Sequence, residues 1–434
     1  MSGILALVDS ILAGVDSELN EEVCETTLKG AGPDVSRIVP PSVTLERVTG
    51  LFEQVGITRV ANLTGLDRIG IPVVAVMRPN SRSYAVAQGK GVTLEAAKAS
   101  GVMESIENYH AEEACFPARF GRYRDLRRQF ELANIAGLPR LATSLFNEDY
   151  PLLWAEGAFD LTSGAPALVP YELASLDFRV PRPQGSGCFL ASSNGLASGN
   201  HLQEATAHAL CELIERDANT IWHLSGGRAQ RRHRIDLETV DDPCCKSLLA
   251  RFADARAGVL AWETTTDVGV ASVLCDVFDL DPDPLFPMPP VGGSGCHPLR
   301  RIALSRALTE AAQGRLTRIS GSRDDLTNHR FEHPSARRTN ASNLELLREP
   351  GPICFGDIPN LEHDTVEEDV LWLCDSLRAA GLHQILRMDL TREDLCVPVV
   401  RMVVPHLEGL SEVPGYVPGV RARRLMEKAW AAES

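Results

Sequence analysis

The sequence predicts an α/β (α+β) fold with large mixed sheets, on the strength of three observations. Short runs rich in β-branched residues are typical of buried strands. Longer segments rich in Ala, Leu and Glu are typical of helices. The two kinds of segment alternate along the chain, without a GxGxxG motif of the dinucleotide-binding type. Such alternation indicates sheets covered by helices.

Each predicted element follows from its local composition. The first 22 residues, MSGILALVDSILAGVDSELNEE, are interpreted as an amphipathic helix rather than a signal peptide, because they lack a basic leader and soon turn acidic. The other elements follow the β-branched runs and the Ala-, Leu- and Glu-rich runs. In chain order these are a strand over 73–76, helices over 91–113 and 201–220, a strand over 271–278, helices over 298–318 and 365–381, and a strand over 397–404.

Composition narrows the classes of function. The chain has 434 residues, of which 44% are hydrophobic and 23% charged, as in an ordinary globular protein. A net charge of -15 argues against nucleic acid as a partner, because a phosphate backbone binds basic surfaces. No apolar run has the length of a membrane helix, so no membrane partner is expected. Eleven cysteines without a CxxC pair favour a reducing, cytoplasmic location over a disulfide framework.

Three predicted helices carry the same acidic signature. Each follows a stretch rich in Gly, Ser or Asn, and each has an acidic or amide pair at positions i and i+3. The pairs are Glu104 with Glu107, Glu212 with Glu215, and Glu310 with Gln313. Alanine or glycine recurs seven and three positions before the first glutamate of each pair. On a helix with about 3.6 residues per turn these small residues flank the glutamate, so that another backbone or a ligand can come close.

The acidic pairs have two interpretations, since paired acids on an Ala-rich helix are often only a solvated face. If the helices converge, however, their charges repel and need cations between them. Hard divalent ions take carboxylate oxygens together with substrate phosphates. Glu204 shares a helical face with Glu212 and Glu215, and Arg306 precedes Glu310 by one turn, where it can carry charge to a phosphate. The pattern alone leaves a solvated face and a metal–phosphate site both open.

These three segments resemble the signature regions of the YcaO family. The first region is glycine–lysine–glycine followed by a helix that ends in ExxE. The second contains SNG, EA and ExxER in order, and the third is RAxxExxQxR. The matching residues are Gly89, Lys90, Gly91, Glu104, Glu107, Ser193, Asn194, Gly195, Glu204, Ala205, Glu212, Glu215, Arg216, Arg306, Ala307, Glu310, Gln313 and Arg315. The resemblance spans roughly residues 60 to 320 and implies the YcaO fold, with Ala/Glu-rich helices lining an ATP–Mg2+ site.

The resemblance implies ATP and Mg2+ as cofactors and a role for each matched side chain. The implied metal ligands are Glu104, Glu107, Glu212, Glu215 and Glu310. The implied nucleotide contacts are Ser100, Asn200, Glu204, Arg216, Arg306 and Gln313. Of these, Arg306 and Arg216 are expected to stabilise the charge that develops during phosphoryl transfer. Asn108 stands where the family usually has arginine, and the family's N-terminal phosphate-binding residues are not matched.

The family's chemistry implies that ATP phosphorylates the oxygen of a peptide backbone amide while a nucleophile attacks its carbon. Sulfide gives a thioamide, a Cys, Ser or Thr side chain gives an azoline, and an amine gives an amidine. The C-terminus lacks the PxPxP run of many azoline-forming members, and ITRVANLTGLDRIGIPVVAVMRPNSRS and VPVVRMVVPHLEG resemble members that work with a TfuA protein. We therefore expect thioamidation of a precursor peptide or protein by a homodimer, with a TfuA-type partner and a sulfide source.

The resemblance also implies a domain organisation. Residues 1–60 are expected to form an N-terminal helical segment and the entry to the core. Residues 61–405 are expected to form the YcaO catalytic domain, with a connecting subregion at about 119–177, and residues 406–434 a C-terminal tail.

Several alternatives stay open. Cys188 and Cys296, each in a GSGC motif, are either small residues of tight loops or a cysteine nucleophile or persulfide carrier. His201 and His208 share a face with the acids and suggest a transition-metal site, but no third ligand accompanies them. The alternative functions for the whole chain are an azoline-forming cyclodehydratase, a ribosomal-protein modification factor and a non-catalytic peptide-binding scaffold.

Overall fold

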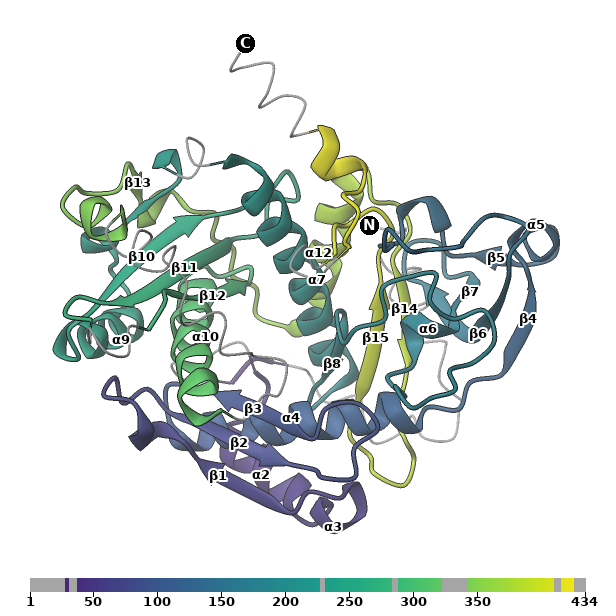
Figure 1. Cartoon of the computed structure of the whole chain (residues 1–434), viewed down its shortest axis with the longest axis horizontal. Helices are drawn as coiled ribbons and strands as arrows, with labels where there is room; N and C mark the ends of the chain where they lie inside the picture. The colour runs from purple at the N-terminus through teal and green to yellow at the C-terminus, as the bar shows by residue number, and fades with distance from the viewer. Residues whose placement is uncertain are drawn as a thin grey trace.

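The computed structural model describes residues 28–30, 37–226, 231–282, 288–321, 342–409 and 415–424. These residues form two three-stranded sheets, a seven-stranded sheet and a small two-stranded sheet, with helices packed against them (Figure 1). The predicted mixed α/β class is therefore confirmed. The amphipathic helix predicted over the first 22 residues lies outside the described residues.

Two antiparallel sheets contain three strands each. The first has the order β1-β2-β3 and the second the order β10-β11-β12. Their strands are β1 (Arg59–Asn62), β2 (Val73–Met77), β3 (Val86–Lys90), β10 (Ala257–Glu263), β11 (Ser272–Asp279) and β12 (Val291–Cys296). Strand β2 is buried on both faces, which is why its sequence VVAVM is continuously apolar instead of alternating. The strands predicted over 73–76 and 271–278 are confirmed to within one residue at each end.

The seven-stranded sheet joins distant parts of the chain. Its order is β5-β7-β6-β14-β15-β8, and β4 pairs with β6. Its strands are β4 (Ala118–Arg122), β5 (Glu131–Leu132), β6 (Pro151–Asp160), β7 (Pro166–Pro170), β8 (Leu196–Ser198), β14 (Leu386–Asp389) and β15 (Val399–Val403). The strand predicted over 397–404 is confirmed as β15, which is bounded by Pro398 and Pro405 because proline cannot donate to a ladder. Beside these sheets, β9 (Ile235–Asp236) pairs with β13 (Ile353–Cys354).

The four predicted helices are confirmed to within four residues at each end. They are α4 (Leu94–Glu113), α7 (Leu202–Leu224), α10 (Arg300–Ser320) and α12 (Val366–Ala379). The shorter helices in the described part of the chain are α2 (Pro41–Thr49), α3 (Phe52–Val55), α5 (Tyr123–Leu126), α6 (Tyr171–Ala174) and α9 (Pro243–Asp254). Thr93 caps the N-terminus of helix α4, where its side chain accepts a hydrogen bond from the Ala96 N–H. No helix among the described residues is both long and apolar enough to cross a bilayer.

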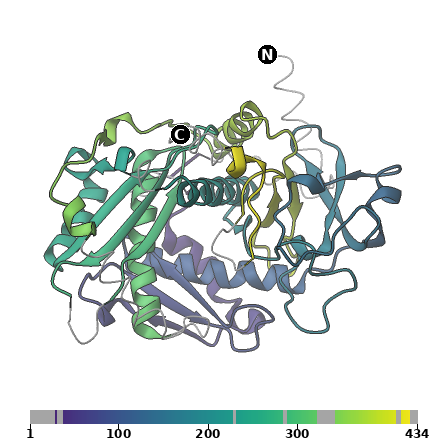
Figure 2. The same ribbon diagram turned by 45° about the horizontal axis from the view of Figure 1, so that its top comes forward.

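The three acidic helices form a cyclic arrangement with the three larger sheets (Figures 1 and 2). Helix α4 packs on β2 and β3 and also contacts β8. Helix α7 packs on β8 and β15 and also contacts β12, while α10 packs on β11 and β12 and also contacts β3. Each helix therefore covers its own sheet and touches the strand that precedes the next helix in the cycle. This arrangement makes the three acidic faces meet.

Glycine in the preceding strands explains the small residues that recur on the helices. A Cβ built on Gly89 of β3 would lie 2.0 Å from the Ala97 carbonyl oxygen and 2.2 Å from the Gly101 nitrogen of α4. A Cβ built on Gly293 of β12 would lie 2.2 Å from the Ala307 carbonyl oxygen of α10. Real Cβ atoms never approach so closely, so the helix backbone rests directly on the strand backbone. The expected close approach is confirmed, and the approaching group at these positions is the protein's own backbone.

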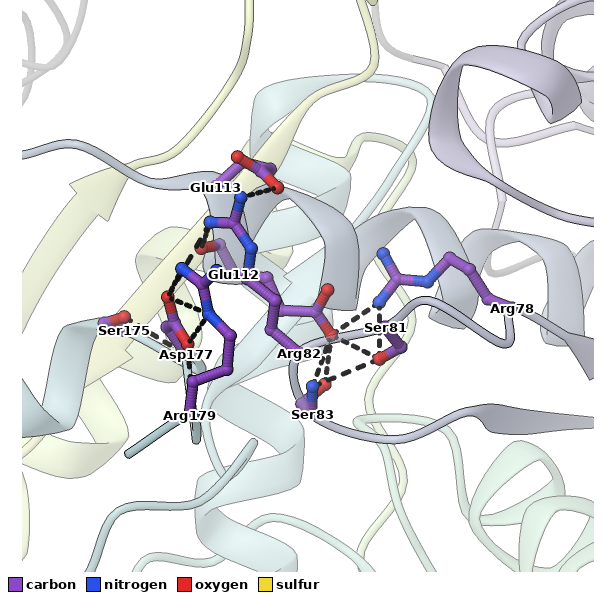
Figure 3. A network of polar contacts seen from close by, with 9 residues as sticks. All are labelled: Arg78, Ser81, Arg82, Ser83, Glu112, Glu113, Ser175, Asp177 and Arg179. Carbon is purple, nitrogen blue, oxygen red and sulfur yellow. Dashed lines mark hydrogen bonds and ion pairs between the residues drawn. The ribbon is translucent and has the colours of Figure 1, made fainter. Parts of the chain in front are cut away.

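A buried polar network fixes the C-terminal end of α4 (Figure 3). The Glu112 carboxylate, 3% exposed, pairs with Arg78 at 2.5 Å and accepts a hydrogen bond of 2.7 Å from Ser81 Oγ. The Ser83 backbone N–H and hydroxyl donate to the same oxygen. Residues 78–83 belong to the connection between β2 and β3, so the network ties this loop to the helix and holds the helix axis against its sheet.

Candidate functional site

The structure brings glutamates of α4 and α7 together, as the converging arrangement predicts. Burial raises the pKa of Glu107 well above its usual range, and the charges of Glu212 and Glu104 raise it further. Burial also raises the pKa of Glu212, where the charge of Glu215 adds to the effect. Glu104 is exposed and Glu107 and Glu212 are half-buried. These pKa shifts mean that the carboxylates repel one another in the protein alone.

Two of these carboxylates accept hydrogen bonds from strands of other sheets than the one their own helix covers. Glu107 Oε2 on α4 accepts a hydrogen bond of 2.8 Å from the backbone N–H of Ser198, at the end of β8. Glu215 Oε1 on α7 accepts a hydrogen bond of 2.8 Å from Ser294 Oγ on β12. The same hydroxyl lies 3.4 Å from Glu310 Oε1, so Ser294 sits between α7 and α10. Sequence reasoning missed Ser294, although it lies in the glycine-rich stretch before the third helix.

Lysine and arginine surround the carboxylate of the third helix. Lys90 Nζ, at the end of β3, lies 2.7 Å from Glu310 Oε2. Burial acts to raise the pKa of Glu310, but Lys90, Arg216 and Arg306 together lower it to about 2. Arg216 Nη1 also lies 3.5 Å from Glu215 Oε1. Glu310 is thus a charged carboxylate next to cations.

Glu204 and Asn200 form a separate buried cluster with the N-terminal part of the chain. Glu204, 3% exposed, accepts hydrogen bonds from the Asn200 backbone N–H and Nδ2, both at 3.1 Å. Arg37 Nη1 and the Ile38 N–H each lie 3.0 Å from its carboxylate. Burial raises the pKa of Glu204, but Arg37 and these hydrogen bonds lower it overall. Sequence reasoning missed Arg37, because no local pattern connects residue 37 to the second acidic helix.

Arg306 points at a neutral histidine. Its Nη1 donates a 3.0 Å hydrogen bond to His208 Nδ1 on α7. Burial lowers the pKa of His208 well below its usual range, and the charges of Arg306, Arg37 and Lys90 lower it further, so the ring stays neutral and can accept. His201 instead caps α7, where its Nδ1 accepts from the Gln203 N–H. The two histidines therefore have other partners than a shared transition metal.

Two residues expected to contact the nucleotide make contacts between elements. Ser100 Oγ on α4 accepts a 3.4 Å hydrogen bond from the Lys90 N–H. Gln313 Nε2 on α10 donates a 2.9 Å hydrogen bond to the Gln88 carbonyl oxygen on β3. Both contacts hold the end of β3, and with it the side chain of Lys90, beside the acidic helices.

The two GSGC cysteines are buried thiols. Burial raises the pKa of Cys188 to about 11 and raises that of Cys296 well above its usual range. Cys188 is 1% exposed and Cys296 is fully buried. Because the thiolate is the nucleophile, these pKa shifts favour the small-residue interpretation over a cysteine nucleophile.

A buried arginine interacts electrostatically with the acids of α4 and α7. Arg401 on β15 is 1% exposed, and its Nη1 donates 2.9 Å hydrogen bonds to the Ser192 and Asn194 carbonyl oxygens. Burial lowers the pKa of Arg401 to about 10, while the charges of Glu212 and Glu107 act to raise it. Sequence reasoning missed this residue, although a charged side chain within the apolar run VPVVRMVVP is a usable signal.

The donor set fits magnesium bound together with a polyphosphate. Among the residues that the structure describes, no three His, Cys, Asp or Glu side chains are grouped to hold a metal ion by themselves. Magnesium commonly takes one or two carboxylates and completes its shell with phosphate oxygens and water. Burial raises the pKa of Glu107 most, and the charges of Glu212 and Glu104 add a repulsion that a divalent cation would relieve. Lys90, Arg216 and Arg306 supply positive charge for phosphates.

Comparison with known proteins agrees with this geometry. The model of the YcaO cyclodehydratase family, described as ATP- and Mg2+-binding, matches residues 88–408. The chain belongs to the YcaO family. The family match covers all three acidic helices and the strand that carries Arg401. It confirms the resemblance found in the sequence, and ATP and Mg2+ are the ligands of this family.

Two relatives from other organisms align over most of the chain. An uncharacterised protein in the tfuA 3′ region of Rhizobium leguminosarum bv. trifolii is 36% identical, covering 86% of this chain and 88% of its own length. An uncharacterised protein of Methanothermobacter thermautotrophicus is 35% identical, covering 87% of this chain and 96% of its own length.

Solved structures show the same fold. The YcaO of Methanopyrus kandleri, bound with AMPPCP and Mg2+, superposes with a TM-score of 0.71 at 23% identity, covering 91% of this chain and 99% of that chain. A heterocyclase in complex with substrate and cofactor superposes with a TM-score of 0.70 at 21% identity, covering 89% of this chain. The present chain spans about half, 54%, of that heterocyclase.

Proposed function

We propose that this YcaO protein activates a backbone amide of a peptide or protein by ATP-dependent phosphorylation of the amide oxygen, and that it forms thioamides. The observation that carries the ATP-dependent step is the meeting of carboxylates from α4, α7 and α10 beside Lys90, Arg216 and Arg306. A site with both charges supports binding of a metal polyphosphate.

The proposed magnesium ligands are the carboxylates that repel one another or face the cations. They are Glu104, Glu107, Glu212, Glu215 and Glu310. Magnesium, when bound, supplies Lewis-acid neutralisation of the phosphate oxygens. The Ser198 N–H and the Ser294 hydroxyl orient Glu107 and Glu215.

We divide the proposed nucleotide contacts into direct and supporting groups. Arg216 and Arg306 stabilise the charge of the transferring phosphoryl group, and His208 orients Arg306 through the Nδ1 hydrogen bond. We propose that Asn200 and Glu204 bind the nucleotide as a pair that Arg37 holds in place. Ser100 and Gln313, which bind the backbone of β3, would act mainly by placing Lys90.

The relative in the tfuA 3′ region supports thioamide formation with a TfuA-type partner. In the proposed reaction a sulfide sulfur adds to the amide carbon, and the amide oxygen takes the γ-phosphoryl group of ATP. The carbon–oxygen bond then breaks, so that the products are a thioamide, ADP and phosphate. Azoline formation is the second candidate, because the matching family is described as cyclodehydratases. There a side chain of the substrate replaces sulfide, and water is lost overall.

The proposal is tested by the intact mass of candidate precursor peptides after incubation with the full chain, ATP, Mg2+, sulfide and a TfuA-type protein. Exchange of oxygen for sulfur is expected, and it should disappear when ATP or sulfide is omitted. Glu215→Ala and Glu310→Ala should abolish the change. Glu113→Ala is the matched control, since Glu113 lies at the far end of α4 in an ion pair with Arg82 and should leave the product unchanged.

The outcomes separate the candidates. Loss of water in place of sulfur gain would identify an azoline former. Wild-type protein that fails to bind ATP with Mg2+ would contradict the amide-activation proposal and favour a peptide-binding scaffold. A homodimer, also proposed, would appear as twice the chain mass in light scattering.

A further inference from the structure

Arg401 has more hydrogen-bonding capacity than the described residues use. It is 1% exposed, and its Nη1 alone binds the Ser192 and Asn194 carbonyl oxygens. Nε and Nη2 are buried and have no hydrogen-bond partner in the structure. A buried donor without an acceptor costs free energy, and a buried cation costs more unless charges nearby compensate for it. The cost of burying Arg401 in the interior of a sheet must therefore be offset by another interaction.

The compensating charges are those of the acidic site. Glu212 and Glu107 both interact electrostatically with Arg401, and they are the carboxylates whose mutual repulsion marks the junction of α4 and α7. Glu212 belongs to α7, which packs on β15, the strand of Arg401. Arg401 therefore belongs to the strand on which α7 packs, and its charge interacts with both carboxylates.

Arg401 is also linked mechanically to Glu107. Strand β15 pairs with β8 so that Arg401 is opposite Leu196 and Val399 is opposite Ser198. The carbonyl oxygens that Arg401 binds belong to the loop that leads into β8. Ser198, at the end of this strand, donates its N–H to Glu107 Oε2. Arg401 thus fixes the loop before β8, and Ser198 of β8 in turn binds the Glu107 carboxylate.

We propose that Arg401 is a positioning residue of the magnesium–nucleotide site. It fixes the loop before β8 through Nη1, and its two nitrogens without a partner, Nε and Nη2, are available to the oxygens of Glu107 and Glu212. The two carboxylates are thereby kept close together and ready for a divalent cation, despite their repulsion. This inference rests on the proposed function of the site, and it adds a residue from the C-terminal part of the chain to it.

Arg387 provides a matched control. It lies on β14, the strand next to β15, where it is half-buried and pairs in register with Met402. Its Nη1 is also buried without a partner. Its electrostatic partners are Asp389 and Cys374, none of the acids of the site. A substitution at Arg387 therefore reproduces the loss of a buried arginine from the same sheet without touching Glu107 or Glu212.

The test compares Arg401→Met, Arg401→Lys and Arg387→Met in the full chain. Binding of AMPPCP is measured by calorimetry over a range of Mg2+ concentrations, and the melting temperature is recorded without ligand. We expect Arg401→Met to raise the Mg2+ concentration for half-maximal binding about tenfold, equivalent to about 1.4 kcal/mol. Arg401→Lys keeps the charge but not the fork of donors, so a smaller increase is expected. Arg387→Met should leave the Mg2+ dependence unchanged.

Other results would overturn the proposal. An unchanged Mg2+ dependence in both Arg401 variants, with only a lower melting temperature, would reduce Arg401 to a structural role. Tighter Mg2+ binding by Arg401→Met would show that its charge merely repels the cation. If Arg401→Met does not fold, Arg401→Lys decides between these results. Wild-type protein that binds no AMPPCP with Mg2+ would instead refute the proposed function.

Discussion

Replacing Glu310 with glutamine should destabilise the protein, although burial and neighbouring glutamates raise the pKa of Glu107 and Glu212 in the same site. The pKa of Glu310 falls from an ordinary 4.5 to about 2, because Lys90, Arg216 and Arg306 outweigh the opposite effect of burial. At about 1.4 kcal/mol per pKa unit, the charged carboxylate stabilises the folded state by up to ~3.5 kcal/mol at neutral pH. Its side chain is 27% exposed, so solvent screening makes this an upper value.

The pH dependence follows from the sign of the shift. Since the folded-state pKa is depressed, the stabilisation is complete above pH 4.5 and is lost as the pH falls toward 2. Urea unfolding followed by tryptophan fluorescence should show a constant deficit in the unfolding free energy of Glu310→Gln between pH 8 and pH 6, at most about 3.5 kcal/mol. The deficit should shrink below about pH 4.5.

Glu107→Gln provides the opposite case in the same site. The folded-state pKa of Glu107 is raised by burial and by Glu212 and Glu104, so its ionised form destabilises the protein as the pH rises above the usual glutamate range. The variant should therefore be more stable than wild type at pH 7 and converge with it in acid. If Glu107→Gln and Glu310→Gln shift stability in the same direction at pH 7, neighbouring charges do not set these energies and the reasoning is refuted.

Two further predictions concern packing and acid sensitivity. Gly293→Ala should destabilise the chain by about 3 kcal/mol in urea unfolding, because the new Cβ would lie 2.2 Å from the Ala307 carbonyl oxygen. Gly65→Ala is the control, since a Cβ there would meet no atom within 4 Å. Equal effects of the two substitutions would contradict the packing argument. His208 has a depressed pKa, so the unfolded chain takes up protons below about pH 6.5 while the folded ring does not, and stability falls there. His208→Gln should flatten this loss in melting curves recorded from pH 7 to pH 5, and an undiminished slope would assign the acid sensitivity to other groups.

Local patterns in the sequence predicted the helices and strands, because secondary structure depends largely on residues that are close in the sequence. The i, i+3 acids and Ala-rich composition predicted α4, α7 and α10, and β-branched runs predicted β2, β11 and β15. The recurrent small residues predicted a close approach, but a spacing rule cannot say which backbone comes close. In the structure it is Gly89 and Gly293 of the preceding strands.

The site residues that sequence reasoning missed are those that lie far along the chain from the glutamates they contact. Arg37 reaches Glu204 across 167 positions, and Ser294 reaches Glu215 across 79. Arg401 meets the second acidic helix because α7 packs on β15, a strand formed much further along the chain. Strand order is set by packing of the whole chain, so neither propensity nor motif spacing determines it.

The cyclic packing explains why three motifs spread over more than 200 residues form one site. A glutamate of each acidic helix is bound by the strand that precedes another acidic helix. Ser198 of β8 binds Glu107 of α4, and Ser294 of β12 binds Glu215 of α7. Lys90 of β3 forms an ion pair with Glu310 of α10. One acidic helix with its own sheet would lack the partner for its carboxylate. With only two such helix–sheet pairs, at least one carboxylate would still lack its partner. The charged site therefore forms only when all three sheets have assembled, which couples ligand binding to the stability of the complete fold.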